Sequence, residues 1–170
     1  MTTQSGLALL DDKFEGRNGV RRPSRVAAGT SLDMESKLPL VAVAVESNQD
    51  RSRLVQLLDS LNVGVIAHKS LATLRRSLLR DEVDLVITDV TLPDGNWIDV
   101  LRLTFEASPP PGIIVHSRLV NDRLWSEVLW RGAYDMLIAP YSTDDGCTII
   151  EGALRTGCLL ARSQPIGMKH

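Results

Sequence analysis

The sequence predicts an α/β fold in which a doubly wound, five-stranded parallel sheet is covered by helices on both faces. Short apolar segments alternate five times with segments whose apolar residues recur at helical spacing, and short connections join them. This alternation is typical of a parallel sheet. The first apolar segment, residues 40–45 (LVAVAV), is continuous and rich in valine, as expected for a strand that is buried on both faces.

Capping residues and breakers set the expected bounds of the elements. The prolines at positions 109–111 end the third helix, and Gly132 is a typical residue just past the end of a helix. The second helix is expected to place Leu71, Leu74, Leu78 and Leu79 on one side. Strands are expected at 40–45, 63–67, 84–88, 112–116 and 134–138, and helices are expected to start at Asn48 or Asp50, at Ser70, at Asn96, at Asn121 or Asp122, and near Ser142.

The chain of 170 residues is long enough for one domain with some additional length. We expect a flexible extension over residues 1–38, one domain over residues 39–162, and a polar tail over residues 163–170. A basic contact site in the extension is an alternative to a solvated tail, and it would comprise Arg21, Arg22 and Arg25.

Charge and composition exclude several classes of protein. A net charge of −2 and an aromatic fraction of 4% give no basis for a nucleic-acid-binding surface. No apolar run is long enough to span a membrane, and the N-terminus lacks the basic start of a secretory signal, so we expect a cytoplasmic protein. Cys147 and Cys158 are expected in the last helix as small apolar residues.

Two carboxylates and a hydroxyl follow three of the expected strands. Glu46 follows the first strand, Asp89 the third and Ser117 the fourth. Ligand crevices of doubly wound sheets lie at the carboxyl ends of the strands, where the first and third strands would be neighbours. Two carboxylates in one crevice repel unless a cation or a proton lies between them, and such oxygen ligands suit Mg²⁺. Ser117 is placed to donate a hydrogen bond to Asp89.

Four segments resemble the receiver domain of response regulators in two-component signalling. They are residues 45–48 (VESN), 84–95 (DLVITDVTLPDG), 114–117 (IVHS) and 132–140 (GAYDMLIAP). The stretch DVTLPDG, which begins at Asp89, is fairly specific when it follows an apolar strand. The resemblance extends over most of the chain and implies a flavodoxin-like fold with the strand order 2-1-3-4-5.

The resemblance also implies an activity and its residues. A sensor histidine kinase or a phosphotransfer protein would donate a phosphoryl group to Asp89. Mg²⁺ would be held by Asp89, by Glu46 and by the backbone carbonyl of Thr91. Ser117 would contact a phosphoryl oxygen and shift on activation.

The sequence departs from the receiver pattern in ways that weaken this site. Phosphoryl transfer depends mainly on positioning and charge stabilisation, so the loss of a lysine beside the acceptor and of one metal-binding acid reduces its efficiency. The departures are Ser47 in place of the second acid, Ala139 in place of the lysine, Met136 in place of the switch aromatic, and Arg118 in place of a small residue.

Two interpretations of Arg118 remain open. Its guanidinium partly replaces the missing positive charge, or its side chain points to solvent and crowds the entrance of the site.

Three functions are compatible with these features. The first is a single-domain receiver, controlled by phosphorylation of Asp89, whose output passes through protein contacts. The second is a degenerate receiver that binds partners without phosphorylation. The third is a small phosphatase of the haloacid-dehalogenase type, which we disfavour because Thr91 stands where that family has a second aspartate. We expect no enzyme activity beyond phosphorylation and dephosphorylation of the chain itself.

Partner contacts are expected at the face formed by the fourth helix, the fifth strand and the fifth helix. Trp130 should point to solvent, because Leu129 is placed on the buried side of its helix. Trp130 and Tyr141 are candidates for contact with a downstream protein or a second copy, with simple surface packing as the alternative. Trp97 and Trp125 are expected to pack the helices on the sheet.

The three histidines are expected in different places. His116 should lie in the core or the crevice, and His68 and His170 should lie at the surface.

Overall fold

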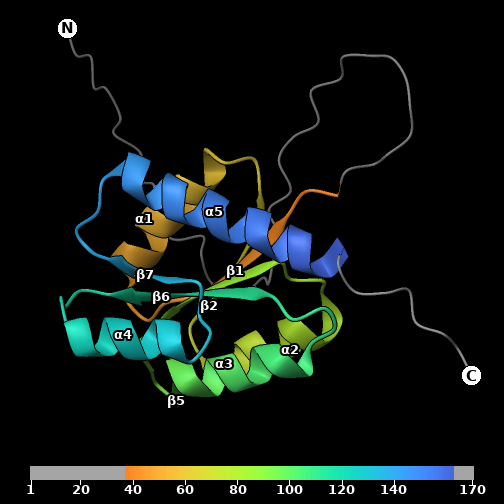
Figure 1. Ribbon diagram of the computed structural model, residues 1–170, viewed down its shortest axis with the longest axis horizontal. Helices are drawn as coiled ribbons and strands as arrows, with labels where there is room; N and C mark the ends of the chain where they lie inside the picture. Colours follow the sequence, from red (N-terminus) through yellow and green to blue (C-terminus); the bar gives the residue numbers. More distant parts are fainter. Residues whose placement is uncertain (1–36, 163–170) are drawn as a thin grey trace, which may run out of the picture.

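Residues 37–162 are described by a computed structural model (Figure 1). Almost all of the expected extension (1–38) and the expected tail (163–170) lie outside the described residues. The same holds for Arg21, Arg22, Arg25 and His170, and for the side chain of Cys158.

The main sheet has five parallel strands in the order β2-β1-β3-β6-β7. Because β6 and β7 are the fourth and fifth strands of this sheet along the chain, the expected order 2-1-3-4-5 is confirmed. The central strand β3 has β1 on one side and β6 on the other, and its last residue, Asp89, is the register partner of His116. The strands are β1 (Leu40–Ala44), β2 (Gly64–His68), β3 (Leu85–Asp89), β6 (Gly112–Ser117) and β7 (Asp135–Ile138).

Helices cover both faces of the sheet. Helices α1 and α5 pack on one face, and α2, α3 and α4 pack on the other (Figure 1). Alternate strand residues point to opposite faces, so Val41 and Val43 join the core under α1 and α5, whereas Ala42 and Ala44 join the second core. The helices are α1 (Asn48–Asp59), α2 (Leu71–Arg80), α3 (Trp97–Glu106), α4 (Asp122–Trp130) and α5 (Thr143–Arg162).

Helix α4 ends as the sequence predicts. Gly132 lies just past α4 with a φ of 99°, a conformation that favours glycine. The expected N-caps of α2, α3 and α4 are also confirmed, and they are Ser70, Asn96 and Asn121.

The start of α1 differs from the expectation. Its N-cap is neither Asn48 nor Asp50 but Ser47, whose hydroxyl accepts a hydrogen bond from the Asp50 N–H at 3.3 Å. Ser47, which stands in place of the second acid of the receiver pattern, therefore has a structural role. The carboxylate of Asp50 is left available for another contact.

The burial of two side chains differs from the expectation because of the periodicity of the strand or helix that carries them. His68 ends the edge strand β2 and is buried, since a period of two places it on the same face as the buried Ile66. Leu79 is exposed, because Leu74 and Leu78, four positions apart, take the inward side of α2. The expectations of a surface His68 and an inward Leu79 are therefore wrong.

Helix α4 buries less of its surface than the sequence suggests. Val128 is its fully buried residue, and Leu124 packs beside it. Trp125 is 44% exposed and donates its indole N–H to Asp135 at 3.1 Å. Leu129 is also exposed. The expectations that Trp125 packs on the sheet and that Leu129 lies inward are therefore wrong.

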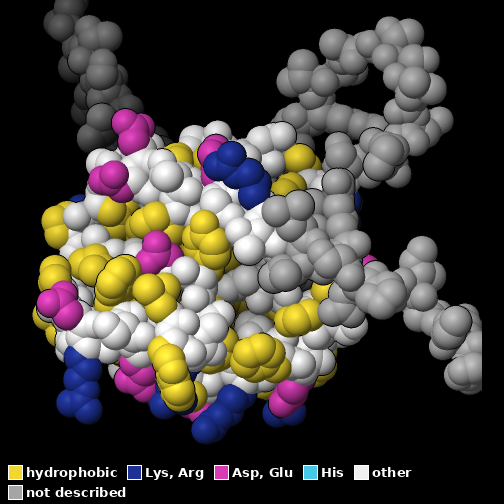
Figure 2. Space-filling view, viewed as in Figure 1, with side chains coloured by type: hydrophobic (Ala, Val, Ile, Leu, Met, Phe, Trp, Pro, Cys, Tyr) yellow, Lys and Arg dark blue, Asp and Glu magenta, His cyan; other side chains and the backbone are white. Residues whose placement is uncertain are grey.

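Exposed hydrophobic side chains gather at the edge of the molecule where β7 and α4 lie (Figure 2). Trp130 is 84% exposed, which confirms its expected orientation, whereas Trp97 is buried as expected. We call this set the α4 apolar surface. It comprises Leu119, Val120, Trp125, Leu129 and Trp130.

A small antiparallel hairpin, β4 (Thr91–Leu92) and β5 (Gly95–Asn96), follows Asp89. Asp94, at its turn, accepts hydrogen bonds from the N–H groups of Leu71 (2.7 Å) and Ala72 (2.9 Å) at the start of α2. A Cβ on Gly95 would lie 2.8 Å from a methyl carbon of Leu71, so the hairpin packs closely against α2.

Across residues 37–162, none of the helices combines the length and apolar character needed to cross a membrane.

Candidate functional site

The candidate site lies at the carboxyl ends of β1, β3 and β6, the three central strands of the sheet. Asp89 ends β3, Glu46 lies two residues beyond β1, and Ser117 ends β6. Since the strands are parallel, their carboxyl ends meet at one edge of the sheet, where crevices of such folds lie. The structure therefore brings the three predicted strand-end residues to one edge.

Asp89 is held by two nitrogen atoms. Its Oδ2 accepts a hydrogen bond from the backbone N–H of Glu46 at 2.9 Å, and its Oδ1 lies 2.6 Å from Nδ1 of His116. An ionised carboxylate can only accept, so this contact requires the proton on Nδ1. The Asp89 side chain is 19% exposed and the His116 side chain is buried. His116 thus occupies the expected crevice position, in contact with the expected phosphoacceptor.

Asp50, which was expected only as a possible helix cap, is a second carboxylate of the site. Its side chain is 5% exposed, although it lies in the first turn of α1. Both of its oxygens accept hydrogen bonds from one guanidinium, from Nε of Arg118 at 2.7 Å and from Nη2 at 2.8 Å. These hydrogen bonds hold the pKa of Asp50 below its usual value, so the carboxylate is ionised at neutral pH.

Neither interpretation of Arg118 describes this arrangement fully. The side chain is 56% exposed, but its guanidinium is fixed on Asp50 and does not extend freely into solvent. The carboxylate of Asp50, and to a smaller extent that of Asp89, raise the pKa of Arg118. Arg118 therefore adds positive charge near Asp89 while it is bound to another acid.

The hydroxyl of Ser117 is engaged within its own loop. It donates to the carbonyl of Leu119 and accepts from the Leu119 N–H, both at 3.1 Å. Among residues 37–162 the structure shows no hydrogen bond between Ser117 and Asp89. A contact of Ser117 with a phosphoryl group would require its hydroxyl to leave these two hydrogen bonds with Leu119.

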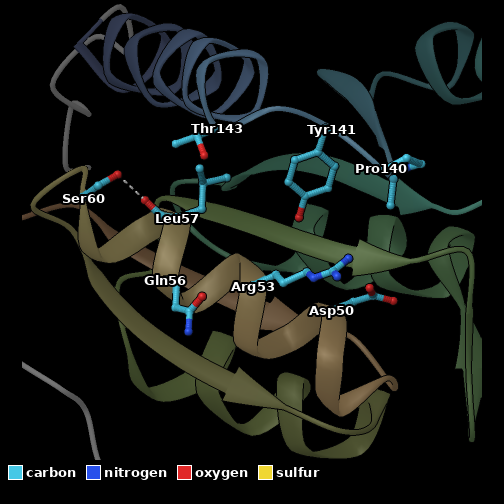
Figure 3. Close-up of a pocket in the computed structure, with 9 residues that line it drawn as sticks. Asp50, Arg53, Gln56, Leu57, Ser60, Pro140, Tyr141 and Thr143 are labelled. Atoms are coloured by element: carbon cyan, nitrogen blue, oxygen red, sulfur yellow. Dashed lines mark hydrogen bonds between the residues drawn. The ribbon is translucent and has the colours of Figure 1, made fainter.

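Tyr141 closes the site from the side of β7. Its ring meets that of His116 edge to face, with centroids 6.3 Å apart and planes at 89°. Burial raises the pKa of Tyr141 to about 12, so its hydroxyl stays protonated at neutral pH. The half-buried side chain points toward α1 (Figure 3). Tyr141 thus lines the side of the site that faces α1, and its expected contact with a partner stays a prediction.

A groove of about 300 Å³ runs between α1 and the segment that joins β7 to α5. In Figure 3, Asp50, Arg53 and Gln56 reach it from α1, and Pro140 and Tyr141 face them. Ala139, in the position of the receiver lysine, lines the groove without adding a charge.

The residues implied for Mg²⁺ do not fit that ion as they are arranged. Glu46 is exposed, both oxygens of Asp89 already face nitrogen atoms, and Thr91 lies in the hairpin. Asp50 uses both of its oxygens on Arg118. Within the described part of the chain, no group of three acidic, histidine or cysteine side chains is placed to hold a metal ion. Mg²⁺ needs several oxygen ligands that are free of competing donors.

Comparison with known proteins supports the fold. No family model matches the sequence. The DNA-binding transcriptional regulator NtrC of Bradyrhizobium sp. (strain RP501 Parasponia) is 33% identical over 114 residues, which are 67% of this chain and 24% of that protein. The chain thus spans about a quarter of the length of the curated relatives it matches.

Two solved structures are similar over most of the described residues. The signal receiver domain of an HD domain-containing protein from Pseudomonas fluorescens Pf-5 has a TM-score of 0.70 at 19% identity and covers 79% of this chain and 100% of its own. A response regulator receiver domain from Clostridium thermocellum has a TM-score of 0.64 at 22% identity and covers 72% of this chain and 99% of its own.

The sheet order and the two layers of helices define a doubly wound α/β protein. Within that class, the fold is that of the response-regulator receiver domain, as the resemblance in sequence implied.

Proposed function

We propose that this chain is an atypical receiver in two-component signal transduction, with Asp89 as its phosphoacceptor. The observation that carries this proposal is the position of Asp89 in a receiver fold. Its carboxylate ends the central strand, remains partly exposed, and is oriented by the Glu46 N–H and by His116. The donor would be a sensor histidine kinase or a phosphotransfer protein. Mg²⁺ has no part in this proposal, because the carboxylates are not arranged to hold it.

Phosphorylation is tested by incubating the chain with acetyl phosphate and measuring its intact mass. We expect one phosphoryl group to be added to the wild-type chain and none to Asp89→Asn. Asp144→Asn, which changes an exposed carboxylate at the start of α5, is the matched control and should be labelled like the wild type. Labelling that persists in Asp89→Asn would show that the acceptor lies elsewhere.

A degenerate receiver, which binds partners without phosphorylation, is the second candidate. It is favoured by Ala139 in the lysine position and by the two nitrogen contacts that already occupy the oxygens of Asp89. Absence of labelling by acetyl phosphate, and by a cognate kinase if one is identified, would support this alternative.

Output would pass through protein contacts at the α4 apolar surface. Trp130 is its most exposed aromatic residue, and exposed aromatic residues are enriched where proteins bind partners. Self-association is the contact that can be measured with this chain alone. Sedimentation equilibrium of wild type and Trp130→Ser, each with and without acetyl phosphate, should show weaker association for the variant. Equal association would exclude Trp130 from such a contact.

A further inference from the structure

Nitrogen groups of the chain itself occupy the carboxylates of Asp50 and Asp89 at the centre of the sheet. Asp50 is bound by the Arg118 guanidinium, and Asp89 is bound by His116 and a backbone N–H. Arg51 adds a further cation at this edge, where it donates to the carbonyls of Val45 (2.6 Å) and Glu46 (3.3 Å). Two carboxylates, those of Asp50 and Asp89, therefore share this edge of the sheet with two arginines and a histidine.

The Asp50–Arg118 pair crosses the end of the strand that carries Asp89. Asp50 lies in α1, which follows β1, and Arg118 directly follows β6. In the sheet β3 lies between these two strands, so the bridge from one neighbour to the other passes over the end of β3. The electrostatic effect of Asp89 on Arg118 is consistent with this placement.

We propose that Arg118, positioned by Asp50, takes the place of a divalent cation in this site. A bidentate guanidinium on a nearly buried carboxylate is a strong contact, and Mg²⁺ would have to displace it to reach that carboxylate. The fixed positive charge also opposes the approach of a second cation. Asp50 is thus a positioning residue, and Arg118 is the cation that it holds.

The consequence for phosphoryl transfer rests on the proposed function of Asp89. An oxygen of Asp89 attacks the phosphorus of acetyl phosphate, the bond from phosphorus to the acetate oxygen breaks, and acetate leaves with that electron pair. The acyl phosphate formed on Asp89 carries additional negative charge, which Arg118 is near enough to stabilise. Transfer should therefore proceed without added Mg²⁺.

The first test measures Mg²⁺ binding directly, by calorimetric titration of the unphosphorylated chain with the metal alone. We expect Arg118→Ala to bind Mg²⁺ at least tenfold more tightly than the wild type, because Asp50 is freed and a positive charge is removed. Adding Asp50→Asn to Arg118→Ala should abolish most of this gain. Arg123→Ala, an exposed arginine of α4, is the matched control and should bind like the wild type. Equal affinity of wild type and Arg118→Ala, whether tight or weak, would overturn the proposal.

Arg118→Met keeps the apolar stem and removes the charge, and it replaces Arg118→Ala in the titration if that variant does not fold. Far-ultraviolet circular dichroism before each titration checks the fold.

The second test compares labelling by acetyl phosphate in Mg²⁺ and in EDTA. We expect the wild-type rate to change less than twofold, and the rate of Arg118→Ala to fall at least tenfold in EDTA and to recover in part with Mg²⁺. Wild-type labelling that is abolished by EDTA would overturn the proposal. If no condition labels Asp89, the proposed function fails, and the direct titration still decides whether Arg118 excludes the metal.

Discussion

The centre of the sheet and its two edges differ in whether their polar side chains are paired and their apolar side chains are exposed. At the centre, the acidic side chains Asp50 and Asp89 each contact a basic side chain. At the β2 edge, His68 is buried and its Nε2 has no hydrogen-bond partner among the described residues. At the opposite edge, beside β7, the α4 apolar surface is exposed to solvent.

The carboxylates at the centre are paired within the chain, although Nε2 of the buried His116 there has no hydrogen-bond partner among the described residues. A buried charge costs several kcal/mol unless it is paired, so pairing at the centre offsets this cost but leaves few free groups for ligands. The β2 edge contains a group whose protonation opposes folding. The β7 edge offers apolar contact area, which only a partner would cover.

The largest effect on the free energy of unfolding is expected from His68 at acid pH. Burial lowers its pKa from 6.5 to about 4, so below pH 6.5 the unfolded chain binds a proton that the folded chain does not. The contribution of neutral His68 to the free energy of unfolding is fully present above pH 6.5. As the pH falls toward 4, about 3 kcal/mol of this free energy is lost. Urea unfolding at pH 7, 5.5 and 4.5 should show a steeper loss of stability in wild type than in His68→Phe. Parallel losses in the two proteins would contradict this prediction.

A smaller effect on the free energy of unfolding is expected at the centre of the sheet, when the pair of Asp50 and Arg118 is broken. Arg118→Ala leaves the carboxylate of Asp50 without its partner and should lower the free energy of unfolding, by less than the loss expected from His68. This loss is also less than for a fully buried pair, because solvent reaches the half-exposed guanidinium. Adding Asp50→Asn should recover part of the loss in urea unfolding.

The matched control for this pair is Arg131→Ala, which breaks the more exposed contact with Glu127 at 2.8 Å. A pair of this kind on a helix surface contributes at most about 0.5 kcal/mol. If both arginine variants lose the same small amount, the central pair has no special role in stability.

The smallest effect on stability is expected at the β7 edge. Trp130→Ser should change the free energy of unfolding by no more than about 0.5 kcal/mol, because an exposed side chain loses few contacts. Quenching of tryptophan fluorescence by acrylamide should decrease, since the most exposed of the tryptophans is removed. Trp97→Phe, which changes a buried tryptophan, should show the opposite pattern. A loss above 1 kcal/mol in Trp130→Ser would show that this residue packs on the fold.

Most of the fold follows from local patterns in the sequence. The continuous apolar strands, and caps such as Ser70 and Asn96, depend on neighbouring residues, so they could be predicted. The errors fall on residues whose burial depends on distant elements. His68 lies at the end of an edge strand, and Trp125 lies on a helix that packs only lightly on the sheet.

The candidate site was predicted only in part, for the same reason. The strand ends place Glu46, Asp89 and Ser117 at one edge of the sheet, and their positions follow from the alternation of strands and helices. The Asp50–Arg118 pair joins residues 68 positions apart, and no local pattern links them. The sequence does place an acidic residue and an arginine near two predicted strand ends. Only the order of the strands in the sheet brings these two residues together.

The hairpin after Asp89 has a consequence for how a change at the acceptor would spread. Asp94 lies in the hairpin turn, and both oxygens of its carboxylate accept hydrogen bonds from the first turn of α2, while a Cβ on Gly95 would lie 2.8 Å from the Leu71 side chain. The segment after the acceptor is therefore attached to the start of α2 by two hydrogen bonds and a close side-chain contact. We expect a change in the position of Asp89 to reach α2 through this hairpin, and an alanine at Gly95 would require the Leu71 side chain to move.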